Sequence, residues 1–208
     1  MAFIVSFEGA DASGKTTLST LVTKELIALG YEVIYCEEFP DSYIDGYLNK
    51  LVLTSPYIDL NSSVKTPVSQ TMVLAGLLTY KYEALIKPEL HTDKIIVVDR
   101  YYFSFASYQG EILESHGINF PFEDILKLLV IPNLTIHVTC SKETRERRLK
   151  SRNIIVSDME SEFFESIDGR IAKLADSHSH TTLNNENSLK ENMQILLRYI
   201  LKNHCIVR

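Results

Sequence analysis

The stretch Gly9-Ala10-Asp11-Ala12-Ser13-Gly14-Lys15-Thr16 decides the fold, because it matches the phosphate-binding pattern G-x-x-x-x-G-K-[ST]. It follows a short β-rich apolar run from Ala2 to Phe7 and precedes a helical pattern that begins near Lys15 and ends at Gly30. Gly9 and Gly14 allow backbone torsions that turn successive N–H groups inward beside the helix N-terminus. A strand, this loop and a helix in that order predict a cradle for nucleotide phosphates.

Three side chains are expected to complete the cradle. Lys15 should reach the β- and γ-phosphates, and the hydroxyl of Thr16 should ligate Mg²⁺. Asp99 ends the β-branched run from Lys94, where open α/β sheets bind their ligands, and we expect it to hold the Mg²⁺ shell. An Asp at the end of a strand is by itself more often a cap, and the loop in the same chain favours the metal role. The residues expected to contact the nucleotide are Gly9, Ala10, Asp11, Ala12, Ser13, Gly14, Lys15, Thr16 and Thr17.

The rest of the chain alternates between strand and helix patterns. Strands are predicted at 31–36, 94–99, 134–139 and 180–183, and the second of these is expected to be central. Helices are predicted at about 41–53, 66–90, 103–115, 122–130, 158–175 and 189–201, with an Arg-rich helix starting near residue 141. Strands that alternate with helices predict a three-layer α/β/α fold with a parallel central sheet of about five strands.

Composition excludes several classes of protein. The chain has 208 residues, long enough to bury about 70% of its unfolded surface as one domain. With 45% apolar and 23% charged residues it is neither a disordered nor a collagen-like chain. A net charge of −6 argues against a protein that coats a nucleic acid polymer, and leaves a small anionic ligand open.

The cysteines and the apolar runs indicate a reducing compartment. Cys36, Cys140 and Cys205 show no metal or redox spacing, and the first two end apolar runs, so both are expected to be buried thiols. No apolar stretch approaches the ~18 residues that cross a bilayer, and a strand pattern, with no signal peptide, follows Met1. The cytoplasm is therefore the expected location, without a membrane partner.

With these positions assigned, the chain resembles the thymidylate kinase family of P-loop kinases over nearly its whole length. The resemblance rests on four segments: Phe7 to Thr17 (FEGADASGKTT), the Phe39-Pro40 pair, Ile86 to Leu90 (IKPEL) and Asp99 to Gly110 (DRYYFSFASYQG). The last is close to the family's D-R-Y-x-x-S-x-x-A-Y-Q signature, with Ser107 in place of Ala. The resemblance implies a single P-loop kinase domain over residues 1–208, with ATP as phosphoryl donor, Mg²⁺, nucleotide substrates and a homodimer.

The resemblance also assigns the residues that would bind the acceptor. Arg100 would grip the acceptor's phosphate, which suits a guanidinium fork. Ser104, Tyr108 and Gln109 would face the acceptor nucleoside, together with Phe39, and Asp11 would turn to a sugar hydroxyl or the metal. Without the Asp-Arg-Tyr segment, Ser104 and Tyr108 would be interpreted as a helix cap and a tyrosine at the core edge.

Charge at the transferred phosphate is expected to come from a mobile lid. Position 12 is Ala, so the loop offers no cation beyond Lys15. A short Arg-rich lid at about 141–158 would supply it, and Arg148 and Arg152 match the family's basic lid helix best. The alternative is a solvated helix face that pairs with its own glutamates.

Two departures from the family concern the acceptor. Asp41 and Ser42 follow Phe39-Pro40, where the family usually has an Arg for the monophosphate. Leu74 and Leu78 stand where it has an aromatic side chain that stacks on thymine and an Arg that binds the base. Lys81 shares their helix face, as does position 85, but a point charge makes no bidentate contact.

Three functions follow from these observations. The first is transfer of the γ-phosphoryl of ATP to a nucleoside monophosphate, with dTMP or a related deoxynucleotide as the first candidate, giving the diphosphate. The second is a kinase for a nucleoside or another small hydroxyl acceptor, with Glu8 or Asp99 as the general base. The third is a nucleotide-binding module without kinase activity.

Overall fold

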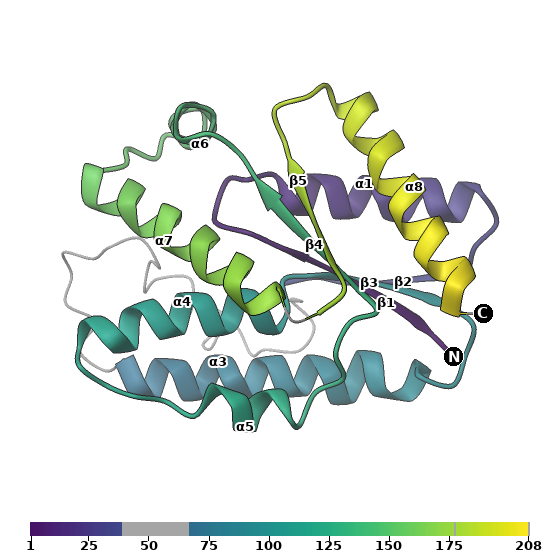
Figure 1. The fold of residues 1–208 in the computed structure, drawn as a ribbon, viewed down its shortest axis with the longest axis horizontal. Coiled ribbons are helices and arrows are strands. Elements are labelled where there is room, and N and C mark those ends of the chain that lie inside the picture. The colour runs from purple at the N-terminus through teal and green to yellow at the C-terminus, as the bar shows by residue number, and fades with distance from the viewer. Residues whose placement is uncertain (39–66, 177, 208) are drawn as a thin grey trace.

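One five-stranded parallel sheet organises the chain (Figure 1). The structure, a computed structural model, describes residues 1–38, 67–176 and 178–207, so the helix expected at 41–53 and the Phe39-Pro40 pair lie outside the described residues. The strands run in the order β2-β3-β1-β4-β5, and all neighbouring pairs are parallel. Their bounds are β1 Phe3–Glu8, β2 Val33–Cys36, β3 Ile95–Asp99, β4 Leu134–Thr139 and β5 His180–Asn184.

Helices cover both faces of the sheet and make the predicted three layers. Helices α1 (Lys15–Ala28) and α8 (Leu189–Val207) pack on one face, against the alternate β1 side chains that begin with Phe3. Helices α4 (Tyr102–Ser115) and α7 (Asp158–Ala175) share the other face with α3 (Pro67–Lys81). The two shorter helices are α5 (Phe122–Leu126) and α6 (Lys142–Lys150).

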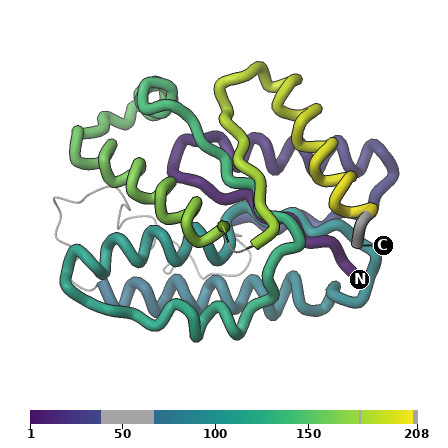
Figure 2. Tube along the Cα trace, in the orientation of Figure 1, coloured from purple at the N-terminus to yellow at the C-terminus, as the bar shows by residue number. Residues whose placement is uncertain are grey.

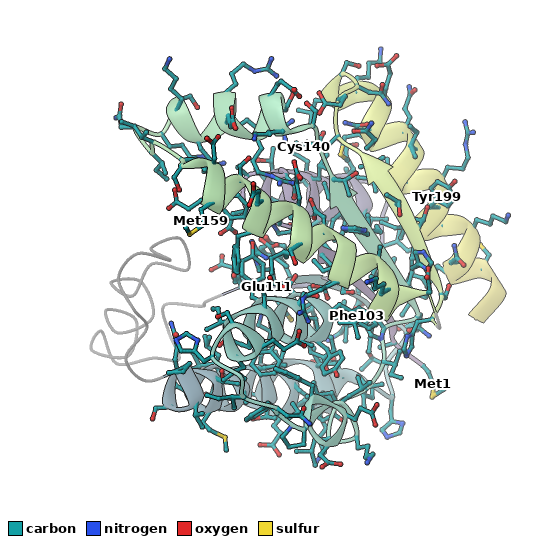
Figure 3. All side chains as sticks on the ribbon, turned by 60° about the vertical axis from the view of Figure 1, so that its left-hand side comes forward. Met1, Phe103, Glu111, Cys140, Met159 and Tyr199 are labelled. Carbon is teal, nitrogen blue, oxygen red and sulfur yellow. The ribbon has the colours of Figure 1, made fainter. Side chains whose placement is uncertain are left out.

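Helices α4 and α7 are joined by charged side chains as well as by their apolar faces. Glu111 of α4, labelled in Figure 3, accepts hydrogen bonds from Arg170 Nε at 2.5 Å and from Ser166 Oγ at 2.7 Å, both on α7. These bonds therefore fix α4 relative to α7.

The middle of the sheet brings two functional loops together. β1 lies at the centre, and β3, which was expected there, is its neighbour between β2 and β1. The register pairs Phe7 of β1 with Asp99 of β3. Because parallel strands end at the same sheet edge, the loop after β1 and the turn after β3 meet there.

Several predicted helix ends need correction. The long helix is α-helical only to Lys81 and continues as a π-helical turn, Tyr82–Ile86, and a 3₁₀ turn, Lys87–Glu89. Pro88 has no N–H to donate to an α-helical ladder. Helix α5 ends at Leu126 and falls short of 130, and α8 extends past 201. Helix α7 has the predicted ends and a capping box formed by Ser157 and Glu160.

The termini and the thiols complete the description. Figure 2 shows the start of β1 and the end of α8 at the same side of the molecule, and the rings of Phe3 and His204 pack edge to face 5.5 Å apart. All three cysteines are free thiols; Cys36 is buried as expected, Cys140 is only partly buried, and Cys205 is exposed. None of the helices in the described part of the chain combines the length and apolarity that crossing a bilayer requires.

Candidate active site

The loop between β1 and α1 has a backbone that depends on its glycines. Gly9 has φ +149° and Gly14 has φ +98°. A Cβ on Gly9 would lie 2.2 Å from the Val138 carbonyl oxygen, and one on Gly14 would lie 2.3 Å from Asn185 Nδ2. Gly14 is the N-cap of α1 and has no capping side chain, and the first turn holds no acid. The helix N-terminus therefore presents its positive end, without an acidic neighbour in that turn, to an anion.

The lysine of the loop is buried and turned back over it. Lys15 Nζ donates a hydrogen bond to the Ala10 carbonyl at 2.7 Å. Burial, and then the neighbouring charge of Arg100, lower the pKa of Lys15 to about 8. Thr16 and Thr17, which follow it, are exposed. A bound anion would therefore raise the pKa of Lys15 again, because it stabilises the charged form that burial disfavours.

The end of β3 offers the oxygen expected for a metal. Asp99 is buried, its Oδ2 lies 3.5 Å from the Tyr35 hydroxyl, and Tyr35 is in turn hydrogen-bonded to Ser19 of α1 at 3.1 Å. Within the part of the chain that the structure describes, Asp99 Oδ1 has no hydrogen-bond partner. An unpartnered buried carboxylate oxygen and the exposed Thr16 hydroxyl are the hard oxygen ligands that a hydrated Mg²⁺ takes, so these residues fit the ion.

A pocket opens between α3 and α4, and Arg100, the residue after Asp99, is part of its lining. It brings together the residues predicted for the acceptor, apart from Phe39, which lies outside the described residues. These are Asp11, Leu74, Leu78, Lys81, Arg100, Ser104, Tyr108 and Gln109. The pocket is also lined by Glu38, Leu77, Tyr101 and Phe105. A mostly apolar pocket with a few polar groups is typical of a small-molecule binding site.

Arg100 joins this pocket to the phosphate loop. Its NH1 donates to the Gly9 carbonyl at 2.9 Å, its NH2 contacts Asp11 Oδ1, and its Nε lies 2.9 Å from Glu38 Oε1. The guanidinium also lies over the Tyr108 ring, 5.0 Å from the centroid. Arg100 adopts a left-handed backbone, φ +55°, which costs about 1–2 kcal/mol for a residue with a Cβ. These contacts hold the side chain in place despite that cost.

Lys81 and Glu8 stabilise the turn that carries Arg100. Lys81 Nζ donates to the carbonyls of Asp99 at 3.2 Å and Arg100 at 3.1 Å, and burial lowers its pKa. Glu8 accepts hydrogen bonds from Tyr101 N at 3.2 Å, from Ser104 N at 2.9 Å and from Ser104 Oγ. Burial raises the pKa of Glu8, and the Ser104 hydroxyl opposes that rise. Glu8 caps the start of α4 with lone pairs already engaged, so a role as general base is unfavourable.

Comparison with known proteins assigns the chain to a family. Residues 7–195 match the family model described as thymidylate kinase. The chain belongs to the thymidylate kinase family. A probable thymidylate kinase from Thermococcus gammatolerans is 28% identical over 156 residues, which cover 74% of this chain and 73% of the relative. Another from Caldivirga maquilingensis is 30% identical over 168 residues, with 79% and 73% covered. The thymidylate kinase from Pelobacter propionicus is 27% identical over 169 residues, with 79% and 74% covered.

The basic helix of this thymidylate kinase relative lies against the phosphate loop. Arg148 NH1 donates to the carbonyls of Ala12 at 3.1 Å and Ser13 at 2.9 Å, and its NH2 donates to the Asn185 carbonyl at 2.9 Å. Arg148 therefore stabilises the backbone of the phosphate loop. Arg152 is exposed just beyond α6, and its side chain has no partner among the described residues.

Three residues that the family comparison did not suggest complete the site. Asp168 Oδ1 accepts from Ala10 N at 2.9 Å, and its Oδ2 accepts from Arg145 NH2 at 2.5 Å. Asn185 Nδ2 donates to the Ser13 carbonyl at 2.7 Å. Glu38 faces Arg100, as described above. The sequence alone does not indicate these residues. Asp168 and Asn185 lie far along the chain from their partners, and Glu38 belongs to no motif.

Proposed function

We propose that the protein is an ATP- and Mg²⁺-dependent phosphotransferase whose acceptor is a nucleoside monophosphate, with dTMP or a related deoxynucleotide as the first candidate. The observation that carries this proposal is the position of Arg100. Its guanidinium is bonded to Gly9 and Asp11 of the phosphate loop and also lines the pocket between α3 and α4. Donor and acceptor sites that share one cation are adjacent, as direct phosphoryl transfer requires.

Each side chain has a proposed task. Lys15 and the loop amides bind the β- and γ-phosphates of ATP, and Thr16 and Asp99 would hold Mg²⁺, which when bound neutralises charge on the phosphate oxygens. Arg100 binds the acceptor at its phosphate, and the apolar slot beside Leu74 and Leu78 takes its base. Arg148 holds the phosphate loop by its hydrogen bonds to the loop carbonyls. Arg152, which is exposed and has no partner among the described residues, is the candidate for charge at the transferred phosphoryl group.

A second candidate function has its own supporting observation. Two carboxylates, Glu38 and Asp11, face the guanidinium that a monophosphate would need. This favours an acceptor that ends in a hydroxyl, such as a nucleoside or another small alcohol. The homodimer implied by the family resemblance and the cytoplasmic location expected from the sequence stay predictions, and light scattering of the purified protein tests the first.

The test is ATP-dependent ADP release measured across purine and pyrimidine nucleosides and their monophosphates. The proposal predicts acceptor-dependent release with at least one deoxynucleoside monophosphate. Replacing Arg100 by Ala should lower kcat/KM for that acceptor by about 100-fold, since it removes a charge-assisted bidentate contact. ATP affinity should fall much less, although the bonds to Gly9 and Asp11 of the phosphate loop are lost as well. Tight ATP binding with no release stimulated by any acceptor would reject phosphotransfer and leave a nucleotide-binding module.

A further inference from the structure

The acceptor pocket contains a carboxylate, that of Glu38, which lies against the guanidinium of Arg100. Glu38 is the second residue after the end of β2, and its Oε1 lies 2.9 Å from Arg100 Nε. Asp11 contacts the NH2 nitrogen of the same guanidinium. The edge formed by Nε and a terminal nitrogen is one that a phosphate grips with two parallel hydrogen bonds. In this structure two carboxylates face that edge.

The charges of the pocket already balance. Among the described residues that line it, Asp11 and Glu38 are acidic, and Lys81 and Arg100 are basic. Lys81 already donates two hydrogen bonds, to the carbonyls of Asp99 and Arg100. A phosphate dianion would therefore enter beside two carboxylates, whereas a hydroxyl could donate a hydrogen bond to Glu38.

We propose that Glu38 is a specificity-determining residue, which disfavours acceptors that carry a phosphate relative to those that end in a neutral hydroxyl. The inference rests on the proposed phosphotransferase function. Glu38 acts in two ways in the same direction: it neutralises Arg100, and it repels an anion that approaches the same edge. Repulsion of the wrong ligand is a common source of specificity.

The charge of Glu38, rather than its size, is the feature that matters. Glu38→Gln keeps the shape and removes the charge, so the edge of Arg100 becomes available to a phosphate. Glu37 is the adjacent residue, is exposed and does not line the pocket, so Glu37→Gln makes the same change in net charge outside the site. It is a matched control for any long-range effect of charge.

The experiment compares each variant with the wild-type protein on a nucleoside and its monophosphate with the same base. The measured quantity is the ratio of kcat/KM for the monophosphate to kcat/KM for the nucleoside. We expect Glu38→Gln to raise this ratio at least tenfold, the equivalent of about 1.4 kcal/mol, and Glu37→Gln to leave it within about twofold. ATP affinity and a thermal melt show that both variants are folded, and Glu38→Ala replaces Glu38→Gln if the latter is not.

Failure of this inference differs from failure of the proposed function. A ratio that is unchanged or lower in Glu38→Gln, or that rises equally in Glu37→Gln, overturns the role of Glu38 while phosphotransfer stands. If the wild-type protein transfers phosphate to no acceptor, the proposed function fails. Calorimetric binding of the nucleoside and the monophosphate then decides the inference through the same ratio of affinities.

Discussion

Removing the carboxylate of Asp168 should destabilise the protein, because that carboxylate joins α7 to the phosphate loop and α6. It accepts hydrogen bonds from the Ala10 amide and from Arg145, and its Oδ1 lies 3.3 Å from His137 Nε2. The Arg145 side chain is only 3% exposed and that of Asp168 is 16% exposed. Asp168→Asn would leave a buried guanidinium without its counter-ion.

The magnitude follows from the burial of the pair. Loss of one partner of a buried ion pair typically costs about 3–5 kcal/mol, and the partial exposure of Asp168 places the expected cost near 3 kcal/mol. For a chain of 208 residues, 1 kcal/mol corresponds to about 2–4 °C, so the midpoint should fall by about 6–12 °C. Replacing both partners, in Arg145→Met with Asp168→Asn, removes the unpaired charge and should recover at least about 1.5 kcal/mol relative to the sum of the single variants.

Urea denaturation of the wild type, both single variants and the double variant measures this coupling. Burial raises the pKa of Asp168, but the hydrogen bond from His137 and the charge of Arg145 outweigh it and hold the pKa below the ordinary 3.8. A carboxylate with a lowered pKa stabilises the fold at pH values above its ordinary pKa, and this contribution is lost as the pH falls below it. Asp168→Asn should therefore weaken the fall in the free energy of unfolding at acid pH. Additive single variants, or an Asp168→Asn protein as stable as the wild type, would refute the account.

Three other perturbations test separate parts of the site. Because the pKa of Lys15 is about 8, ATP affinity measured by calorimetry should fall as the pH rises through that value. Lys15→Arg stays charged and should remove this pH dependence. An unchanged pH dependence in Lys15→Arg would contradict the assignment of the titration to Lys15. Gly9→Ala should abolish ATP binding, since its Cβ would meet a backbone carbonyl, whereas Gly30→Ala has open space and should cost only about 1 kcal/mol of backbone strain in a thermal melt. Equal effects of the two changes would exclude the close contact as the cause. Ser104→Ala should destabilise the fold to urea by about 1–3 kcal/mol by leaving Glu8 with one donor fewer, and no loss would mean that the backbone amides suffice.

Local signals predicted the fold well. Short-range patterns predict the apolar strands, the glycine-rich loop and the helix at 158–175. The five-stranded parallel sheet and helix α7 confirm these predictions. The strand predicted at 180–183 is present in an otherwise polar stretch, as β5. Prediction failed where backbone geometry departs from the α-helix, at Tyr82–Ile86, since periodicity alone carries no signal for a widened turn.

The site was predictable only in part. Motif positions give Lys15, Asp99 and Arg100, and the structure gathers them at one sheet edge. The partners of these residues come from elsewhere in the chain: Asp168 reaches the loop across 158 positions and Asn185 across 172. Such contacts depend on how α7 and β5 pack, which no single stretch of sequence records.

The widened turn after Lys81 fixes what the long helix presents to the pocket. Lys81 and Ile86 are both buried although they stand five positions apart, which on an α-helix would separate them by about 140° around the axis. The π-helical turn absorbs one extra residue and returns both side chains to the sheet side. Deleting one residue from Tyr82–Ile86 would restore regular α-helical winding. Leu74, Leu78 and Lys81 would then rotate together away from the turn that carries Arg100. The direction in which α3 presents these side chains is therefore set by the five residues of the π-helical turn.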